Sequence, residues 1–326
     1  MKVRNLWLVL MLSGMLTFGL FAAGCDPEED IDPDPGEEIE DPIDDEEEVD
    51  EEALDEDEVL RDAADDYFAQ VATDNNMTPS EDIKDQIEAD PDSLLIIDVR
   101  SAEDFEEAHI EGSVHSTVEE LSDIMENIPQ DRDVYIACYS GQNAGYATSA
   151  LRMAGFDNVT TLFYGIDYGW TYEDRGNFDL EGSGMNAAAD LDPVSEPATE
   201  EEEILWEQAQ DIISTGPNWI TVDEHEEMHE SLESDPGSYH VVDIRSEEDY
   251  EEGHIAGAEQ VNWGEVDTII DDLPTTVPVV VACYSGQTGA QTTGVLNMVG
   301  LDNANNLLYG VRDGWVERSD LPLVTE

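Results

Sequence analysis

Basic residues are scarce in this sequence of 326 residues, which has 11 Lys and Arg against 82 Asp and Glu and a formal net charge of -71. Proteins that bind nucleic acid through its phosphates need clustered cations to neutralise the backbone. The sequence contains no such cluster. We therefore expect no nucleic-acid partner.

The excess of acidic residues has two interpretations. A surface covered with carboxylates is typical of proteins that work in concentrated salt, because at about 1 M the Debye length is about 3 Å and self-repulsion is screened. The alternative is a cationic partner that binds the acidic segments. We favour adaptation to high salt.

Cysteine is also rare, and the three that occur are Cys25, Cys138 and Cys283. The last two each lie in the hexapeptide ACYSGQ, between an apolar run and a segment of small residues. An oxidising compartment favours disulfides, but equivalent positions of two separate domains seldom face each other. Two isolated thiols are more typical of two reaction centres.

The start of the sequence has the pattern of a processing signal. Lys2 and Arg4 precede a long apolar run, and Ala-Ala-Gly-Cys at residues 22–25 resembles the lipobox of bacterial lipoproteins, apart from Ala22 where Leu is usual. We expect a signal peptide over 1–24 and a lipid on Cys25. The body would then be held at the cell membrane, outside the cytoplasm. An uncleaved anchor or an ordinary signal peptide are the alternatives.

The rest of the sequence contains a duplication with a constant offset of 145 residues. The segments 95–112 and 240–257 are identical at ten of eighteen positions. The offset takes residues of the first copy onto identical residues of the second, namely Asp98 to Asp243, Arg100 to Arg245, His109 to His254 and Cys138 to Cys283. We infer one domain that occurs twice.

Two acidic segments separate the copies from the signal and from each other. They are too poor in apolar residues to offset the entropy of ordering, so we expect a disordered tether and a linker. A calcium role is not expected, because the D-x-D-x-D-G loop of an EF-hand is absent. The expected divisions are the tether 25–57, the first domain 58–176, the linker 177–202 and the second domain 203–326.

Each copy alternates short apolar strands with helical patterns. The first copy has expected strands at 94–97, 134–137 and 159–163, with helices at 117–127 and 143–154. This alternation predicts an α/β fold, in which two tandem domains each have a central, mostly parallel sheet flanked by helices. Each cysteine would then lie at a strand carboxyl end, where such sheets place reactive groups.

A cysteine between a strand and a helix is close to unpaired backbone N–H groups and to the positive end of the helix dipole. Both should favour the thiolate, which is the nucleophilic form. Gly141 and Gly286 allow the backbone to curl so that its N–H groups form a cradle for an anion. One short loop would thus activate a thiol and hold its charged adduct.

Four motifs resemble the rhodanese superfamily, in the same order in both copies. They are Asp98-Val-Arg100, 105–110, the Cys138 loop and 164–170, and then Asp243-Ile-Arg245, 250–255, the Cys283 loop and 309–315. The resemblance implies sulfurtransferase chemistry, in which Cys138 and Cys283 carry a sulfane sulfur as a persulfide without a cofactor or metal. It also implies two substrate-binding loops, made of Tyr139, Ser140, Gly141, Gln142 and Asn143, and of Tyr284, Ser285, Gly286, Gln287 and Thr288.

Both loops depart from the superfamily pattern. The pattern Cys-x-x-Gly-x-Arg has Asn143 and Thr288 in place of arginine, which puts thiosulfate as the donor in doubt. We expect a small sulfur-containing anion such as polysulfide, or a protein persulfide, as donor and a thiol as acceptor. Ala144 and Gly289 replace the arginine of the phosphatase pattern Cys-x5-Arg, so phosphatase activity is not expected.

Other polar residues could be assigned to catalysis, but structural roles are favoured. We expect one group to brace the cysteine loops through ion pairs and hydrogen bonds rather than to act as acids and bases, namely Asp98, Arg100, His109, Asp243, Arg245 and His254. Residues 225–229 match the zinc pattern H-E-x-x-H. The first copy lacks both histidines there, so we expect a solvated helix.

Three classes of function remain. The first is an extracytoplasmic sulfurtransferase with a persulfide in each domain. The second is a non-catalytic module that binds an anion or a protein, which the missing loop arginines favour. The third, a thiol redox protein, is disfavoured because no resolving cysteine accompanies Cys138 or Cys283.

Overall fold

The computed structural model describes residues 54–325. The expected signal peptide, Cys25 and most of the expected tether lie outside the described residues. No helix in the described part of the chain is long and apolar enough to cross a membrane.

Each copy forms one five-stranded sheet in which every neighbouring pair is parallel. The first sheet has the order β1-β5-β4-β2-β3, with strands β1 (Met77–Thr78), β2 (Leu94–Asp98), β3 (Val114–His115), β4 (Asp133–Ala137) and β5 (Val159–Leu162). The second has the order β6-β10-β9-β7-β8, with β6 (Trp219–Ile220), β7 (His240–Asp243), β8 (Glu259–Gln260), β9 (Val279–Ala282) and β10 (Ala304–Leu307). The predicted fold class is confirmed.

The helices of the two copies also correspond in order. Those of the first copy are α1 (Glu56–Val71), α2 (Ser80–Ala89), α3 (Ala102–Glu107), the 3-10 helix η2 (Glu119–Asn127), α4 (Gln142–Met153) and the π-helical turn η3 (Ile166–Trp170). Those of the second are α5 (Glu200–Thr215), α6 (Val222–Ser234), α7 (Glu247–Glu252), the 3-10 helix η5 (Trp263–Asp272), α8 (Gln287–Met298) and the π-helical turn η6 (Gly310–Val316). Short 3-10 turns lie at Pro91–Ser93 (η1) and Ala188–Asp190 (η4).

The expected helix at 117–127 is a 3-10 helix rather than an α-helix. Its buried residues Leu121, Ile124 and Asn127 are spaced by three. A turn of three residues brings such positions onto one face. The other expected helix and the three expected strands agree with the structure to within one residue at each end.

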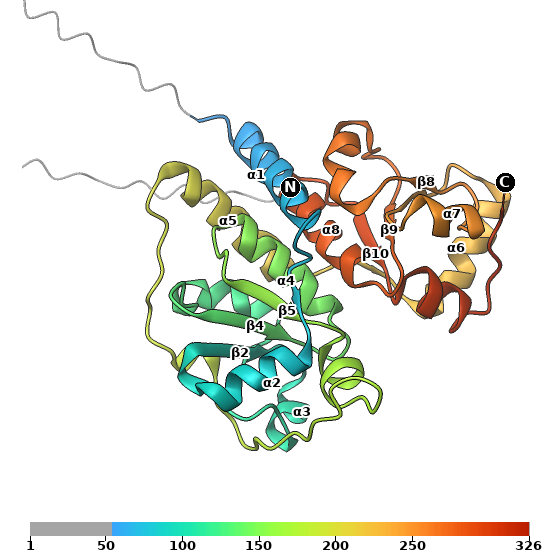
Figure 1. The fold of residues 1–326 in the computed structure, drawn as a ribbon. Coiled ribbons are helices and arrows are strands. Elements are labelled where there is room, and N and C mark those ends of the chain that lie inside the picture. Colours follow the sequence, from blue (N-terminus) through green and yellow to red (C-terminus); the bar gives the residue numbers. More distant parts are fainter. Residues whose placement is uncertain (1–53, 326) are drawn as a thin grey trace, which may run out of the picture. The chain divides into compact units, whose positions relative to one another are not determined.

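The first helix of each copy packs against the other copy. Helix α1 contacts η5 and α8, and α5 contacts η2 and α4 (Figure 1). The hydroxyl of Tyr67 donates to Oε1 of Gln291 at 2.5 Å, and Nε2 of Gln210 donates to the carbonyl of Ser122 at 3.1 Å. The ranges 58–176 and 203–326 are therefore not two independent packing units.

The hydrophobic core also includes residues of both copies. One large cluster of buried residues includes side chains of both copies, such as Ile97 and Ile136 of the first and Val242 and Val281 of the second. Smaller clusters lie on the opposite faces of the two sheets, each confined to one copy. Because the central core is shared, each copy stabilises the other.

The expected linker at 177–202 is held against the first copy. The backbone N–H of Val194 donates to the carbonyl of Glu126 at 2.7 Å, and Nδ2 of Asn127 donates to the carbonyl of Leu191 at 2.6 Å. His109 and Gly182 exchange two backbone hydrogen bonds. Ala188 is buried in the shared core and Leu191 packs against it, so apolar contacts and hydrogen bonds together hold the segment.

Candidate active site

Each cysteine lies in the turn between a strand and the helix that follows it. Cys138 follows β4 and precedes α4, and Cys283 follows β9 and precedes α8. The residue before each helix is a glycine in the left-handed region, with φ of 82° at Gly141 and 86° at Gly286. A side chain there would be strained, which explains why both loops have glycine.

The glycine turn directs backbone N–H groups at the sulfur. In the first copy, the N–H groups of Gly141 and Ala144 donate to Sγ of Cys138 at 3.1 and 3.5 Å. In the second, those of Gly286 and Gly289 donate to Sγ of Cys283 at 3.0 and 3.3 Å. The predicted cradle of backbone donors is thus present around both sulfur atoms.

The ionisation of Cys138 differs from the prediction. Burial raises the pKa of the Cys138 thiol, and the N–H groups that lower the pKa offset burial only in part. The residue is 2% exposed, so its thiolate loses most of its hydration. The expectation that the loop favours the thiolate is therefore wrong for the resting Cys138 site. The cradle instead lessens the cost of forming a charge there.

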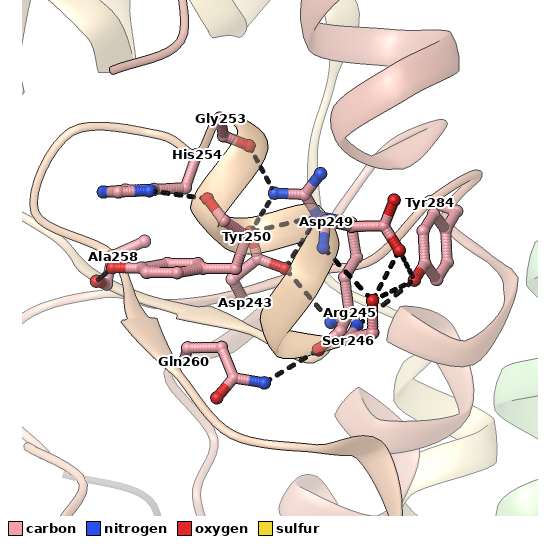
Figure 2. A network of polar contacts seen from close by, with 10 residues as sticks. All are labelled: Asp243, Arg245, Ser246, Asp249, Tyr250, Gly253, His254, Ala258, Gln260 and Tyr284. Atoms are coloured by element: carbon pink, nitrogen blue, oxygen red, sulfur yellow. Dashed lines mark hydrogen bonds and ion pairs between the residues drawn. The ribbon is translucent and has the colours of Figure 1, made fainter. Parts of the chain in front are cut away.

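The hydroxyl of the tyrosine after each cysteine bonds to residues at the start of the short helix α3 or α7. Tyr284 accepts a hydrogen bond from the backbone N–H of Ser246 at 3.2 Å and donates to Oδ2 of Asp249 at 2.5 Å (Figure 2). Tyr139 makes the equivalent bonds with Ser101 and Asp104. These tyrosines anchor their loops, and their side chains do not belong to the cradle.

The remaining loop side chains have different surroundings. Ser140 and Ser285 accept hydrogen bonds from Nε2 of the glutamine two residues later, at 3.1 and 3.2 Å. Gln142 and Gln287 are buried, whereas Asn143 and Thr288 are half-buried. Asn143 lines the cavity in front of Cys138.

The residues predicted to brace the loops form a buried network in each copy. Nη2 of Arg245 is 2.6 Å from Oδ2 of Asp243 and donates to the carbonyl of Gly253 at 2.8 Å (Figure 2). Nη2 of Arg100 makes the same contacts with Asp98 and the carbonyl of Ala108, both at 2.8 Å. The expected ion pairs are present at the ends of β2 and β7.

The two histidines of this set are packed rather than reactive. The ring of His109 stacks on Phe105 with centroids 3.9 Å apart, and Nδ1 is 2.7 Å from the carbonyl of Phe105. His254 stacks in the same way on Tyr250 at 3.8 Å. Each histidine therefore fixes the short helix after the ion pair, α3 or α7.

A cavity of about 280 Å³ opens in front of Cys138. It is lined by Cys138, Tyr139, Ser140, Gln142, Asn143, Asp167 and Tyr168 from the first copy and by Leu308 and Tyr309 from the second. The sequence alone did not single out four of these lining residues, namely Asp167, Tyr168, Leu308 and Tyr309. The motifs at 164–170 and 309–315 predicted a turn that both copies share. They did not show that the turn of the second copy lies at the cavity of Cys138 in the first.

Cys138 and Cys283 are free thiols. The expectation of a solvated helix at 225–229 is wrong for His225, which is fully buried on α6 with Nδ1 at 2.9 Å from Oγ of Ser319. Nε2 of His229 lies 3.8 Å from Glu233. Among the described residues, no group of three or more His, Cys, Asp or Glu side chains is placed to hold a metal ion.

Comparison with known proteins identifies the family. The family described as Rhodanese-like domain matches residues 80–171 and 221–317. The thiosulfate sulfurtransferase GlpE of Vibrio cholerae serotype O1 (strain ATCC 39541) is 30% identical over 88 residues, which are 27% of this chain and 79% of GlpE. YrkF of Bacillus subtilis (strain 168) is 33% identical over 86 residues, which are 26% of this chain and 46% of YrkF. The chain thus spans about half the length of YrkF.

Among solved structures, SseA from Escherichia coli, described as a 3-mercaptopyruvate sulfotransferase, is similar at 19% identity and a TM-score of 0.33. The match covers 71% of this chain and 97% of SseA. The family matches in two regions, each with its own sheet and cysteine turn. The chain belongs to the rhodanese-like domain family and has two such domains in tandem.

Proposed function

We propose that the protein is a sulfurtransferase that carries a sulfane sulfur as a persulfide on Cys138 and on Cys283. One observation carries this proposal, the convergence of two backbone N–H groups on each Sγ atom at 3.0–3.5 Å. Such donors stabilise a negative charge that develops on sulfur or on the sulfur bound to it. Kinship with sulfurtransferases such as GlpE supports the same chemistry.

The transfer has two displacement steps. The thiol loses its proton to solvent, and the thiolate attacks the sulfane sulfur of the donor. The bond between that sulfur and the rest of the donor breaks, and the leaving group departs with the electron pair. An acceptor thiolate then attacks the outer persulfide sulfur, which breaks the S–S bond and restores the cysteine thiolate. The sulfur is transferred at the oxidation level at which it arrived, so no external oxidant or reductant is needed.

The cradle contributes to both steps. The persulfide places its negative charge on the outer sulfur, beyond Sγ and near the start of α4 or α8. Backbone N–H groups at the helix N-terminus stabilise a charge at that place, because they have no partner within the helix. In the second step, the same groups stabilise the departing cysteine thiolate.

The test is to treat the purified chain with polysulfide and, separately, with thiosulfate, and to measure sulfur additions by peptide mass spectrometry. We expect one added sulfur on each of Cys138 and Cys283, and sulfur transfer to cyanide or a thiol. Cys138→Ser and Cys283→Ser should each remove one addition. If the chain binds sulfite but never gains a persulfide from either donor, it is a binding module instead.

We also place the protein outside the cytoplasm, held by a lipid on Cys25. The sequence pattern before Cys25 supports this location. Replacing Cys25 with Ser should release the protein from the membrane fraction or block its processing. Normal cleavage of the signal with unchanged membrane retention would contradict the proposal.

A further inference from the structure

A strained tyrosine lies in front of each cysteine loop. Tyr164 and Tyr309 have φ values of 62° and 63°, in the region that favours glycine. A bulky residue there costs on the order of 1–3 kcal/mol, and such strain concentrates at functional sites. In both copies a glycine follows, and this glycine is pressed against the carbonyl of the cysteine. In each copy the strain therefore falls on a bulky residue directly beside the cysteine turn.

A glutamine of the other copy holds each strained tyrosine in place. Oε1 of Gln142 accepts from the backbone N–H of Tyr309 at 3.0 Å and from Nδ2 of Asn306 at 3.2 Å. Oε1 of Gln287 accepts from the backbone N–H of Tyr164 at 2.8 Å. These glutamines begin the helices after the two cysteine turns. Each cysteine loop thus fixes the tyrosine of the opposite copy.

Tyr309 lines the cavity of Cys138, although it belongs to the second copy. The guanidinium of Arg318 lies 3.9 Å from the centre of the Tyr309 ring, and Nη2 of Arg318 is 3.2 Å from the hydroxyl of Tyr168. Tyr168 lines the same cavity. A cation just outside the cavity lining therefore contacts two tyrosines that line the cavity. The cysteine loop of this cavity itself has Asn143 and no arginine.

The matching stack in the first copy shows that this cation was not simply inherited through duplication. Arg175 lies 3.7 Å from the ring centre of Tyr164. With the offset of 145, the counterpart of Arg318 is Glu173 and that of Arg175 is Asp320. The two copies thus reach the same tyrosine-arginine stack from different positions, in a chain with only 11 basic residues. Independent placement of a scarce residue type indicates a use for it.

We infer that Arg318, held against the ring of Tyr309, attracts the anionic end of the sulfur donor to the cavity of Cys138, so that the second copy completes the site of the first. The inference rests on the proposed sulfurtransferase function, and it names the donor class as an anionic sulfane-sulfur compound that ends in an oxyanion group. A guanidinium suits an oxyanion because it offers several N–H donors in one plane. Asp167 lines the same cavity and opposes this attraction.

The experiment uses the full chain with Cys283→Ser, so that only the Cys138 site can be loaded. The rate of sulfur addition to Cys138 is measured with thiosulfate, a dianion. Labelling of Cys138 by methyl methanethiosulfonate, a neutral reagent, is measured in parallel. In that reaction the thiolate attacks the sulfenyl sulfur, the S–S bond breaks and methanesulfinate leaves. The neutral reagent reports access to the thiolate without a charge on the donor.

Arg318→Gln should lower the thiosulfate rate about tenfold, as expected for the loss of one charge-assisted contact. Asp167→Asn should raise the rate several-fold, and neither change should alter neutral labelling by more than about twofold. Tyr309→Phe keeps the ring that faces Arg318 and should retain most of the rate. Tyr309→Gly relieves the backbone strain but removes the ring that faces Arg318. It should therefore lower the ratio of the thiosulfate rate to the neutral labelling rate.

The outcomes separate the two proposals. If the Cys283→Ser parent itself gains no persulfide from thiosulfate or polysulfide, the sulfurtransferase proposal fails for this site. If the parent is loaded but Arg318→Gln and Asp167→Asn leave the ratio of thiosulfate to neutral rates unchanged, the role of Arg318 in donor binding is refuted. That role is also refuted if both substitutions shift the ratio in the same direction.

Discussion

The two copies differ less around the sulfur than around the rim of the site. The bracing pairs match, with 2.8 Å between Arg100 and Asp98 and 2.6 Å between Arg245 and Asp243. Asp167, which lines the cavity in front of Cys138, corresponds to Arg312 in the second copy. The backbone of both residues is held alike, because each N–H donates to the carbonyl of the tyrosine after the cysteine, at 2.9 and 3.1 Å.

The residues that hold the cysteine loop can thus be told apart from a residue that lines the cavity in front of Cys138. The first group is the same in both copies because any change would move the cradle. The cavity residue has reversed its charge between the copies without a change of backbone. Arg312 forms an ion pair with Asp313 at 2.5 Å, whereas Asp167 is followed by Tyr168, which bonds Arg318. The duplication has thus kept the cysteine turn in both copies and changed the charge of one residue beside it.

The largest effect should come from breaking a bracing pair. Asp98→Ala and Asp243→Ala each leave a buried arginine without its counter-charge, which costs about 3–5 kcal/mol of unfolding free energy. Because the copies share a core, either change should lower the stability of the whole described part of the chain. Urea unfolding, followed by tryptophan fluorescence and far-UV circular dichroism, measures the unfolding free energy of each variant.

Asp65 provides the control for this prediction, since its side chain is exposed on α1. Asp65→Ala should change the unfolding free energy by no more than about 0.5 kcal/mol. Equal losses from Asp98→Ala and Asp243→Ala would uphold the equivalence of the two scaffolds. A loss from only one of the two substitutions would show that the ion pair of the other copy is dispensable for stability.

A smaller loss should follow from crowding the turn beside the cysteine. A Cβ at Gly165 or Gly310 would lie 2.4 Å from the carbonyl oxygen of Cys138 or Cys283, and both glycines have positive φ. Alanine should therefore cost about 2–4 kcal/mol at either position.

Gly112→Ala and Gly257→Ala are the matched controls for the crowded glycines. These residues also have positive φ, but a Cβ there would meet nothing within 4 Å. They should cost only about 1 kcal/mol, since the strain acts without the clash. Thermal unfolding of the four variants compares the pairs. If the controls lose as much as Gly165→Ala and Gly310→Ala, close packing against the cysteine turn is not the cause.

Much of the scaffold can be predicted from the sequence. Short apolar runs such as 94–97 are typical of strands buried on both faces, and their alternation with helices predicts a parallel sheet. The repeated hexapeptide places Cys138 and Cys283 at strand ends. The bracing pairs follow from Asp and Arg two residues apart at the end of such a strand.

The composite site could not be predicted from the sequence, because it depends on how the copies pack together. Nothing in the local pattern shows that Gln142 bonds the backbone of Tyr309, 167 residues away. The charge on Cys138 was misjudged for a similar reason. Its N–H donors can be inferred from the turn, but its burial depends on the packing of both copies. The local sequence predicts the hydrogen-bond donors of the turn, whereas tertiary packing determines how far the thiol is removed from water.

The smallest expected effect concerns the ionisation of Cys138 and is measured with Cys283→Ser. Since burial raises the pKa of the Cys138 thiol, its labelling rate with iodoacetamide should rise about tenfold per pH unit without levelling off before the range of an ordinary thiol.

The folded chain also binds this proton more tightly than the unfolded chain. The resulting stability is present below the pKa of the unfolded thiol and is lost as the pH rises through the higher pKa of the folded state. Urea unfolding at several pH values should therefore show a decline on the alkaline side that Cys138→Ser, in the same Cys283→Ser background, does not share. A labelling rate that levels off near neutral pH would mean that the N–H cradle outweighs burial. The measurement on Cys283 in the Cys138→Ser chain then gives the second curve for comparing the two copies.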